Sequence, residues 1–134
     1  FDVEAMLRYC FDTLKLENVW VTGWSFGTDL AIQNAKDPRH KGLILLSPPL
    51  RTTTDAQLEY WNTDPRPITA LVPELDDYLQ PAQARERFAI VPKLNIIAVD
   101  EAKHLWLGEP AVHRVLSEIA SIVSGSATTL PLEF

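Results

Sequence analysis

The sequence is poor in the features that mark several large classes of protein. Among its 134 residues there is a single cysteine, Cys10, so the chain cannot form an internal disulfide or a thiolate metal cluster. It has no apolar run of about 18 residues, the length that a transmembrane helix needs. Basic residues are also scarce, with 12 Lys and Arg against 18 Asp and Glu and a net charge of −6. We therefore expect neither nucleic acid nor a membrane surface as a partner.

The apolar content is sufficient for one folded core. Hydrophobic residues make up 46% of the chain and charged residues 22%, values typical of a globular domain rather than of a disordered chain. We expect one domain over residues 1–124, followed by a flexible tail over residues 125–134 that begins with small polar residues. We also expect a cytoplasmic protein, because the first residues have a helical pattern rather than that of a signal peptide.

Helix and strand patterns alternate along the chain. Apolar residues at spacings of three and four, together with proline and capping signals, predict helices over residues 2–14, 26–36, 55–61, 81–88 and 110–123. Short apolar runs predict buried strands over residues 19–22, 42–46, 68–72 and 95–99. The sequence therefore predicts an α/β fold, with a parallel sheet of about four strands and flanking helices.

The most informative motif is Gly23-Trp24-Ser25-Phe26-Gly27, which has the pattern G-x-S-x-G. It lies directly after a predicted strand and directly before a predicted helix, the context in which this pattern places a serine on a sharp, strained turn. The two glycines leave room for the backbone to fold tightly. We interpret Ser25 as a nucleophile; a helix-capping serine is the alternative.

A nucleophilic serine needs a base that accepts its proton. Of the three histidines, His40 precedes a predicted strand, at the opposite end of the sheet from Ser25, and His113 lies inside the last predicted helix. His104 follows the fourth predicted strand and so lies at the carboxyl edge of the sheet, where Ser25 also emerges and where α/β proteins bind their ligands. His104 is therefore the predicted base.

The base in turn needs an acid that orients it. Asp76 and Asp77 follow the third predicted strand and lie at the same carboxyl edge. Spacing alone does not choose between them, and adjacent acids before a helix are also common as capping residues. The lesser candidates are Glu74, Asp100 and Glu101.

In these motifs the chain resembles the α/β-hydrolase superfamily, in particular its esterases and dienelactone-hydrolase-like serine hydrolases. The order serine, acid, histidine is that of the superfamily, residues 71–81 resemble its acid loop, and residues 99–104 resemble its histidine loop. Aligning the acid loop on Pro81 places the acid at Asp76, with Asp77 as the second choice. The resemblance covers nearly all of this chain but only about the C-terminal half of a family domain.

The resemblance implies a serine hydrolase that cleaves an ester or related acyl compound through an acyl-enzyme intermediate. Ser25 would attack the carbonyl, His104 would act as base and then acid, and Asp76 would orient His104, while the Phe26 backbone N–H would donate to the oxyanion. The substrate would be a small acyl compound, and neither a cofactor nor a metal is implied. Aromatic side chains that could form pocket walls are Trp24, Tyr60 and Trp106.

The family's second oxyanion donor comes from a loop before the serine motif, and residues 1–18 contain no such loop. The alternative function is therefore a catalytically incomplete fragment or pseudoenzyme that acts in assembly. The predicted strand at residues 19–22 would also lack a neighbour on one side. We expect this edge to pair with a second copy, giving a homo-oligomer, or with a further part of a longer chain.

Overall fold

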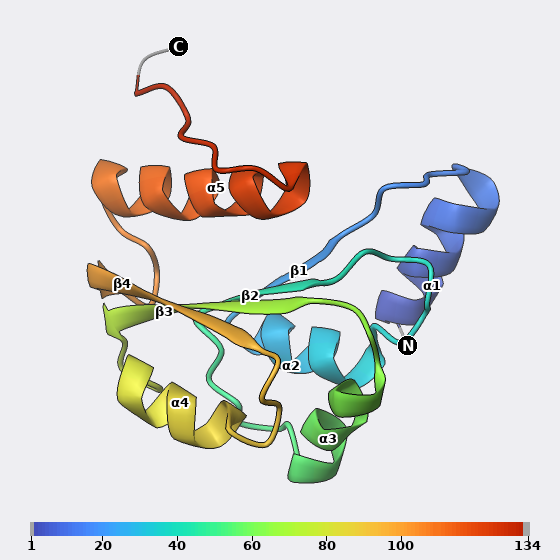
Figure 1. Cartoon of the computed structure of the whole chain (residues 1–134), viewed down its shortest axis with the longest axis horizontal. Helices are drawn as coiled ribbons and strands as arrows, with labels where there is room; N and C mark the ends of the chain where they lie inside the picture. Colours follow the sequence, from blue (N-terminus) through green and yellow to red (C-terminus); the bar gives the residue numbers. More distant parts are fainter. Residues whose placement is uncertain (1, 133–134) are drawn as a thin grey trace.

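A computed structural model describes residues 2–132 (Figure 1). Within these residues, four strands form one parallel sheet in the order β1-β2-β3-β4. The strands are β1 (Val21–Trp24), β2 (Leu43–Leu46), β3 (Ile68–Leu75) and β4 (Asn95–Lys103). The helices are α1 (Asp2–Arg8), α2 (Phe26–Asn34), α3 (Asp55–Thr63), α4 (Pro81–Phe88) and α5 (Glu109–Ser124). The predicted α/β fold with a four-stranded parallel sheet is confirmed.

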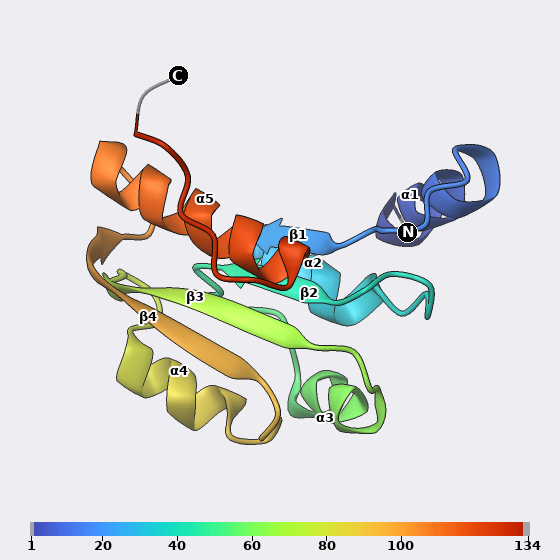
Figure 2. The ribbon, with the colours of Figure 1, turned by 45° about the horizontal axis from the view of Figure 1, so that its top comes forward.

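The helices cover the sheet on both faces. In Figure 1, α2, α3 and α4 lie below the sheet and α5 lies above it, and Figure 2 again shows α3 and α4 on the side opposite to α5. The larger core cluster fills the space between the sheet and α2 to α4 and includes Ile32, Trp61 and Phe88. A smaller cluster, which includes Val99 and Val115, joins the sheet to α5. Because both faces are covered, the inner strand β2 is entirely apolar and β3 is mostly so, whereas the edge strand β4 also carries polar and charged residues.

The first helix differs from its prediction. The spacing predicted one helix over residues 2–14, whereas α1 ends at Arg8 and a π-helical turn, η1 (Tyr9–Thr13), follows it. Leu7 and Phe11, one from each part, are buried in the larger core cluster. The apolar periodicity thus reports the buried side chains correctly but does not distinguish α-helical from π-helical hydrogen bonding.

Two strands are longer than predicted, and both extensions lie next to the predicted site. β3 was expected to end at Val72 but continues to Leu75, and β4 was expected to end at Val99 but continues to Lys103. The two extensions pair across a register shift, with Leu75 opposite Lys103. As a result, Asp76 and His104 are each the first residue after a paired strand.

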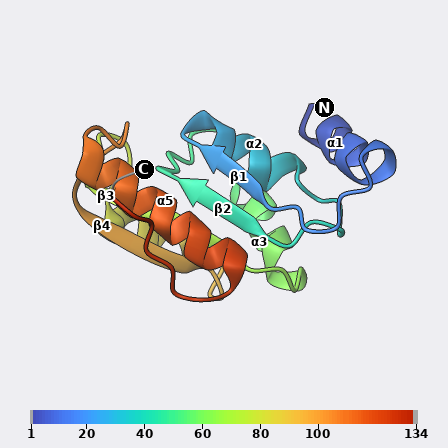
Figure 3. The same ribbon diagram turned by 90° about the horizontal axis from the view of Figure 1, so that it is seen from above.

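β1 lies at one edge of the sheet, and its only hydrogen-bonded neighbour among the described residues is β2 (Figure 3). The pairing of its other edge with a second copy or with a further segment stays a prediction, as does the cytoplasmic location. Within residues 2–132, no helix combines the length and the apolar character needed to cross a membrane.

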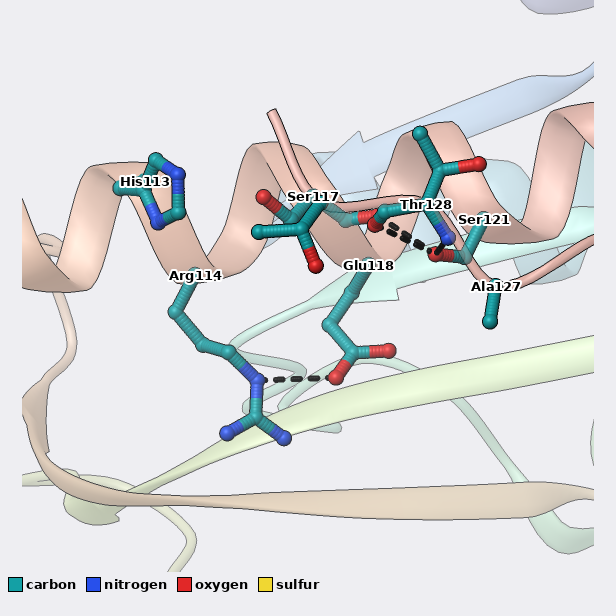
Figure 4. A pocket seen from close by; sticks show the side chains of 8 residues that line it. His113, Arg114, Ser117, Glu118, Ser121, Ala127 and Thr128 are labelled. Carbon is teal, nitrogen blue, oxygen red and sulfur yellow. Dashed lines mark hydrogen bonds and ion pairs between the residues drawn. The ribbon is translucent and has the colours of Figure 1, made fainter. Parts of the chain in front are cut away.

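The segment after α5 runs back along that helix. Figure 4 shows Thr128 beside Ser121, whose hydroxyl oxygen accepts a hydrogen bond from the Thr128 N–H at 2.8 Å. Further along, the Leu130 N–H donates to Ser117 at 3.1 Å and the Leu130 carbonyl accepts from His113 at 2.6 Å. The flexibility of residues 125–134 stays a prediction; residues 133 and 134 of that range lie outside the described part of the chain.

His40 is buried at the amino end of the sheet, as its sequence position indicated. Its side chain is 1% exposed, and Nε2 is 2.7 Å from the Ala35 carbonyl oxygen, to which it donates. Burial lowers the pKa of this imidazole, because the charged form is poorly solvated there. The folded state then binds fewer protons than the unfolded state once the pH falls below the ordinary histidine pKa of about 6.5.

We therefore expect the free energy of unfolding to decrease as the pH is lowered from about 7.5 to about 5.5. The variant His40→Gln, whose amide can still donate to Ala35, is expected to show a smaller decline over the same range. Urea titrations of both proteins at several pH values measure this difference. Equal declines in the two proteins would show that His40 does not contribute to the pH dependence.

Candidate active site

Ser25 lies on a sharp turn between β1 and α2. Its backbone adopts φ 50° and ψ −124°, a region that residues other than glycine rarely occupy. Three hydrogen bonds hold it there: the Ser25 N–H donates to the Leu46 carbonyl at 2.9 Å, and the Ser25 carbonyl accepts from the Thr28 N–H at 2.8 Å and its hydroxyl at 2.7 Å. The turn has the strained geometry expected for the G-x-S-x-G motif.

The two glycines of the motif differ in what surrounds them. A Cβ added at Gly23 would lie 2.5 Å from the Gly27 carbonyl oxygen and 2.8 Å from the Thr28 Cα, because the first turn of α2 passes over β1 at this point. A Cβ at Gly27 would have no described atom within 4 Å beyond its chain neighbours and the backbone of its own helix. The close approach therefore requires glycine at position 23, whereas the described residues leave space for a side chain at position 27.

His104 reaches Ser25 from the end of β4. Its Nε2 is 2.8 Å from the Ser25 Oγ, although 79 residues separate the two in the chain. His104 is largely buried. Its backbone carbonyl oxygen accepts hydrogen bonds from the Ser47 hydroxyl at 2.9 Å and from the Trp24 indole N–H at 3.2 Å. With Nδ1 protonated, Nε2 is free to accept a proton from Ser25.

Asp76 is the acid that contacts His104. Its Oδ2 is 2.9 Å from His104 Nδ1, and its Oδ1 accepts the N–H groups of Tyr78 at 2.7 Å and Leu79 at 3.2 Å. Asp76 is 4% exposed, whereas its neighbour Asp77 is exposed and has no hydrogen bond to His104. The side chains of Ser25, His104 and Asp76 thus form one continuous hydrogen-bonded chain.

The Phe26 N–H, the predicted oxyanion donor, is the first of α2. An α-helix offers no internal acceptor to its first N–H groups, and its dipole favours negative charge at this end. Phe26 directly follows Ser25, so a negatively charged oxygen formed on an atom bound to Ser25 Oγ would lie next to this end of α2.

A cavity of about 380 Å³ opens beside Ser25. It is lined by Ser25, Phe26, Asp29, Pro49, Arg51, Thr52 and Tyr78. Asp29 is fully buried and holds one wall in place, because its Oδ1 accepts the N–H groups of Thr52 at 3.2 Å and Thr53 at 2.9 Å. Arg51 is the only basic side chain in this lining, and its guanidinium lies 5.8 Å from the centre of the Tyr78 ring.

The aromatic side chains predicted as pocket walls lie elsewhere. Tyr60 packs edge-on against Trp61, with the Lys36 ammonium 4.2 Å from its ring centre, and Trp106 is buried in the cluster beneath α5. Trp24 is half-exposed and does not line the cavity; its indole N–H is bonded to the His104 carbonyl. Tyr78, which the sequence reasoning missed, lines the cavity, and its ring centre is 4.8 Å from that of His104.

Four of the six non-glycine residues with positive φ in the described part of the chain lie shortly after strands. Ser25 follows β1, Ser47 and Leu50 follow β2, and Trp106 follows β4; all four have φ between 48° and 53°. Residues in this region of φ cost energy and persist only where the surrounding contacts fix them, which is common at functional sites. The carboxyl edge of the sheet, where the hydrogen-bonded chain lies, therefore holds most of the described residues with this unusual backbone conformation.

The rest of the described chain offers weaker candidates for a functional site, both for binding a metal and as a cavity. Within residues 2–132, no group of three or more His, Cys, Asp or Glu side chains is arranged to hold a metal ion. A second cavity, of about 370 Å³, lies between α5 and the segment that follows it (Figure 4). Its acidic and basic side chains, Arg114 and Glu118, form an ion pair at 2.8 Å.

Comparison with solved structures shows the same fold in α/β serine hydrolases. An α/β serine hydrolase homologue from Coxiella burnetii superposes with a TM-score of 0.67 at 20% identity, over 91% of this chain and 55% of its own. An esterase from Pyrococcus furiosus superposes with a TM-score of 0.72 at 14% identity, over 94% of this chain and 61% of its own. The carboxylesterase CesB from Bacillus subtilis superposes with a TM-score of 0.67 at 17% identity, over 93% of this chain and 66% of its own.

The chain therefore has the fold of part of an α/β-hydrolase, and it spans between about half and two-thirds of the length of these three structures. At identities of 20% or less, the likeness concerns the fold alone. No protein-family model and no curated protein sequence matches the chain.

Proposed function

We propose that the chain is a serine hydrolase that cleaves an ester or related acyl compound. The observation that carries this proposal is the continuous hydrogen-bonded chain from Ser25 Oγ through the His104 imidazole to the Asp76 carboxylate. Residues with this order of contacts activate a serine in hydrolases of several unrelated folds. The esterase and carboxylesterase with the same fold add support of a coarser kind.

In the proposed reaction, His104 Nε2 accepts the Ser25 hydroxyl proton while Oγ attacks the substrate carbonyl carbon. The carbonyl oxygen becomes an oxyanion, and the Phe26 N–H donates to it. The tetrahedral intermediate collapses when the bond to the alcohol breaks, and the leaving oxygen takes the proton from His104. Water then attacks the acyl-enzyme by the same route, which releases the acid and restores Ser25.

Asp76 keeps the imidazole in the required form. Its carboxylate accepts a hydrogen bond from the Nδ1–H group of His104, which leaves Nε2 without a hydrogen and facing Ser25. When His104 takes the second proton, the nearby negative charge stabilises the imidazolium. The two backbone N–H groups on Oδ1 fix the carboxylate itself.

A fluorophosphonate probe tests the proposal, because it phosphonylates an activated serine and leaves an ordinary one unchanged. The folded chain is expected to gain the mass of one adduct, and peptide mass spectrometry is expected to locate the adduct on Ser25. The same chain in urea is the control and is expected to remain unmodified. A folded chain without an adduct would contradict the proposal and favour the catalytically incomplete module.

A further inference from the structure

The backbone carbonyl oxygen of His104 accepts hydrogen bonds from residues at the ends of two other strands. It accepts the indole N–H of Trp24, the last residue of β1, at 3.2 Å. It also accepts the hydroxyl of Ser47, the first residue after β2, at 2.9 Å. His104 itself directly follows β4. Two side chains, one from the last residue of β1 and one from the residue after β2, therefore bond to the main chain of the residue that carries the imidazole.

Ser47 is held firmly enough to act as an anchor. It is 1% exposed, its N–H donates to the Leu71 carbonyl on β3 at 3.0 Å, and its backbone has φ 49°. A serine in this region of φ persists only where several contacts fix it. The neighbouring Leu46 carbonyl accepts the Ser25 N–H at 2.9 Å, so consecutive residues contact the turn at Ser25 and the main chain of His104.

Trp24 makes the second link from the serine side. It immediately precedes Ser25, so its backbone shares the turn that sets the direction of Oγ, while its indole reaches across to His104. Trp24 is half-exposed and does not line the cavity beside Ser25. What this side chain contributes to the site is therefore the bond from its N–H.

We infer that Trp24 and Ser47 are positioning residues that fix the His104 main chain so that Nε2 stays within hydrogen-bonding distance of Ser25 Oγ. The inference rests on the proposed function, because a serine that does not react needs no positioned base. Proton transfer falls off steeply when donor and acceptor move apart. Loss of either bond is therefore expected to slow the chemical step and to leave the binding of the substrate or probe unchanged.

Two variants remove the bonds with little change of shape. Trp24→Phe keeps a large aromatic ring and loses the N–H, and Ser47→Ala keeps the backbone and loses the hydroxyl. Tyr9→Phe and Ser124→Ala are matched controls, since both side chains are exposed and far from the site. Circular dichroism identifies the variants that fold.

The measurement is the reaction with the fluorophosphonate at several probe concentrations, which separates the maximal rate of labelling from the half-saturating concentration. Each site variant is expected to lose about fivefold to tenfold in the maximal rate, the effect of one hydrogen bond, with an unchanged half-saturating concentration. The controls are expected to match the unmodified chain. A raised half-saturating concentration with an unchanged rate would overturn the inference and indicate a binding role.

A second measurement does not depend on reactivity. The Trp24 indole N–H signal in a proton–nitrogen spectrum is identified by its absence from Trp24→Phe. Its exchange with solvent is expected to be at least about tenfold slower in the folded chain than in urea, because it is hydrogen-bonded. Fast exchange would overturn the inference directly. Slow exchange in a chain that forms no adduct would refute both the proposed function and the positioning role. The hydrogen bond from the Trp24 indole N–H to the His104 carbonyl would then be a structural contact without a catalytic purpose.

Discussion

Replacing Asp76 by Asn is expected to slow fluorophosphonate labelling of Ser25 by about 10⁴-fold, the effect that a wrongly held histidine tautomer has in Ser-His-Asp triads. An amide has nearly the size of the carboxylate but carries no charge, and its NH₂ group donates where the imidazole also donates. The substitution therefore favours the imidazole with its proton on Nε2, which cannot accept a proton from Ser25. The His104 imidazole also loses the anion that stabilises its protonated form.

Asp77→Asn is the matched control, because it makes the same chemical change at the next residue. Asp77 is exposed and does not contact His104, so its labelling rate is expected to stay within about twofold of the unmodified chain. The time course of the adduct mass gives both rates. A large loss in Asp77→Asn, or a small one in Asp76→Asn, would contradict the assignment of the acid.

The choice between these two aspartates shows where sequence reasoning reaches its limit in this chain. Both follow the same strand, and spacing places both at the same edge. What separates them is the last pleat of β3: the strand continues to Leu75 because its end pairs with Lys103 across a register shift. This pairing sets where β3 ends, and Asp76, the next residue, is the one whose carboxylate contacts His104. The pairing depends on contacts between segments distant in the sequence, which spacing alone does not reveal.

The arrangement of Ser25 and His104 was easier to predict. Their edge of the sheet follows from the order of strands and helices alone, because the carboxyl ends of parallel strands lie together. Ser47 could have been found by the same argument, since it directly follows the second predicted strand. Its bond to the His104 carbonyl could not, because that bond depends on the rotamer and on the strained backbone of Ser47.

The aromatic side chains predicted as pocket walls do not line the cavity beside Ser25, for a related reason. Aromatic residues near a site in the sequence can point to either face of the sheet. Tyr60 belongs to α3 and packs beside Trp61, and Trp106 is buried under α5 on the opposite face. Tyr78 lines the cavity instead, because the hydrogen bond from its N–H to Asp76 fixes the turn that carries it. Hydrophobic pattern reports burial but not the face on which a loop side chain lies.

The motif glycines give the other large expected effect. Gly23→Ala is expected to lower the free energy of unfolding by about 3 kcal/mol or more, a large share of the 5–15 kcal/mol typical of a domain. The new methyl group would lie 2.5 Å from the Gly27 carbonyl oxygen and 2.8 Å from the Thr28 Cα, and both contacts are with backbone. To relieve these two close contacts, α2 would have to move away from β1, which would also displace Ser25.

Gly27→Ala is the matched control within the same motif. Its methyl group would meet no described atom within 4 Å beyond its chain neighbours and the backbone of its own helix, and alanine favours a helix over glycine by up to about 1 kcal/mol. Stability is therefore expected to stay the same or rise slightly, as measured by urea unfolding followed by circular dichroism. Equal destabilisation by both substitutions would show that the motif needs glycine for backbone freedom at both positions. A loss confined to Gly23→Ala would show that the close approach of α2 to β1 holds the turn at Ser25.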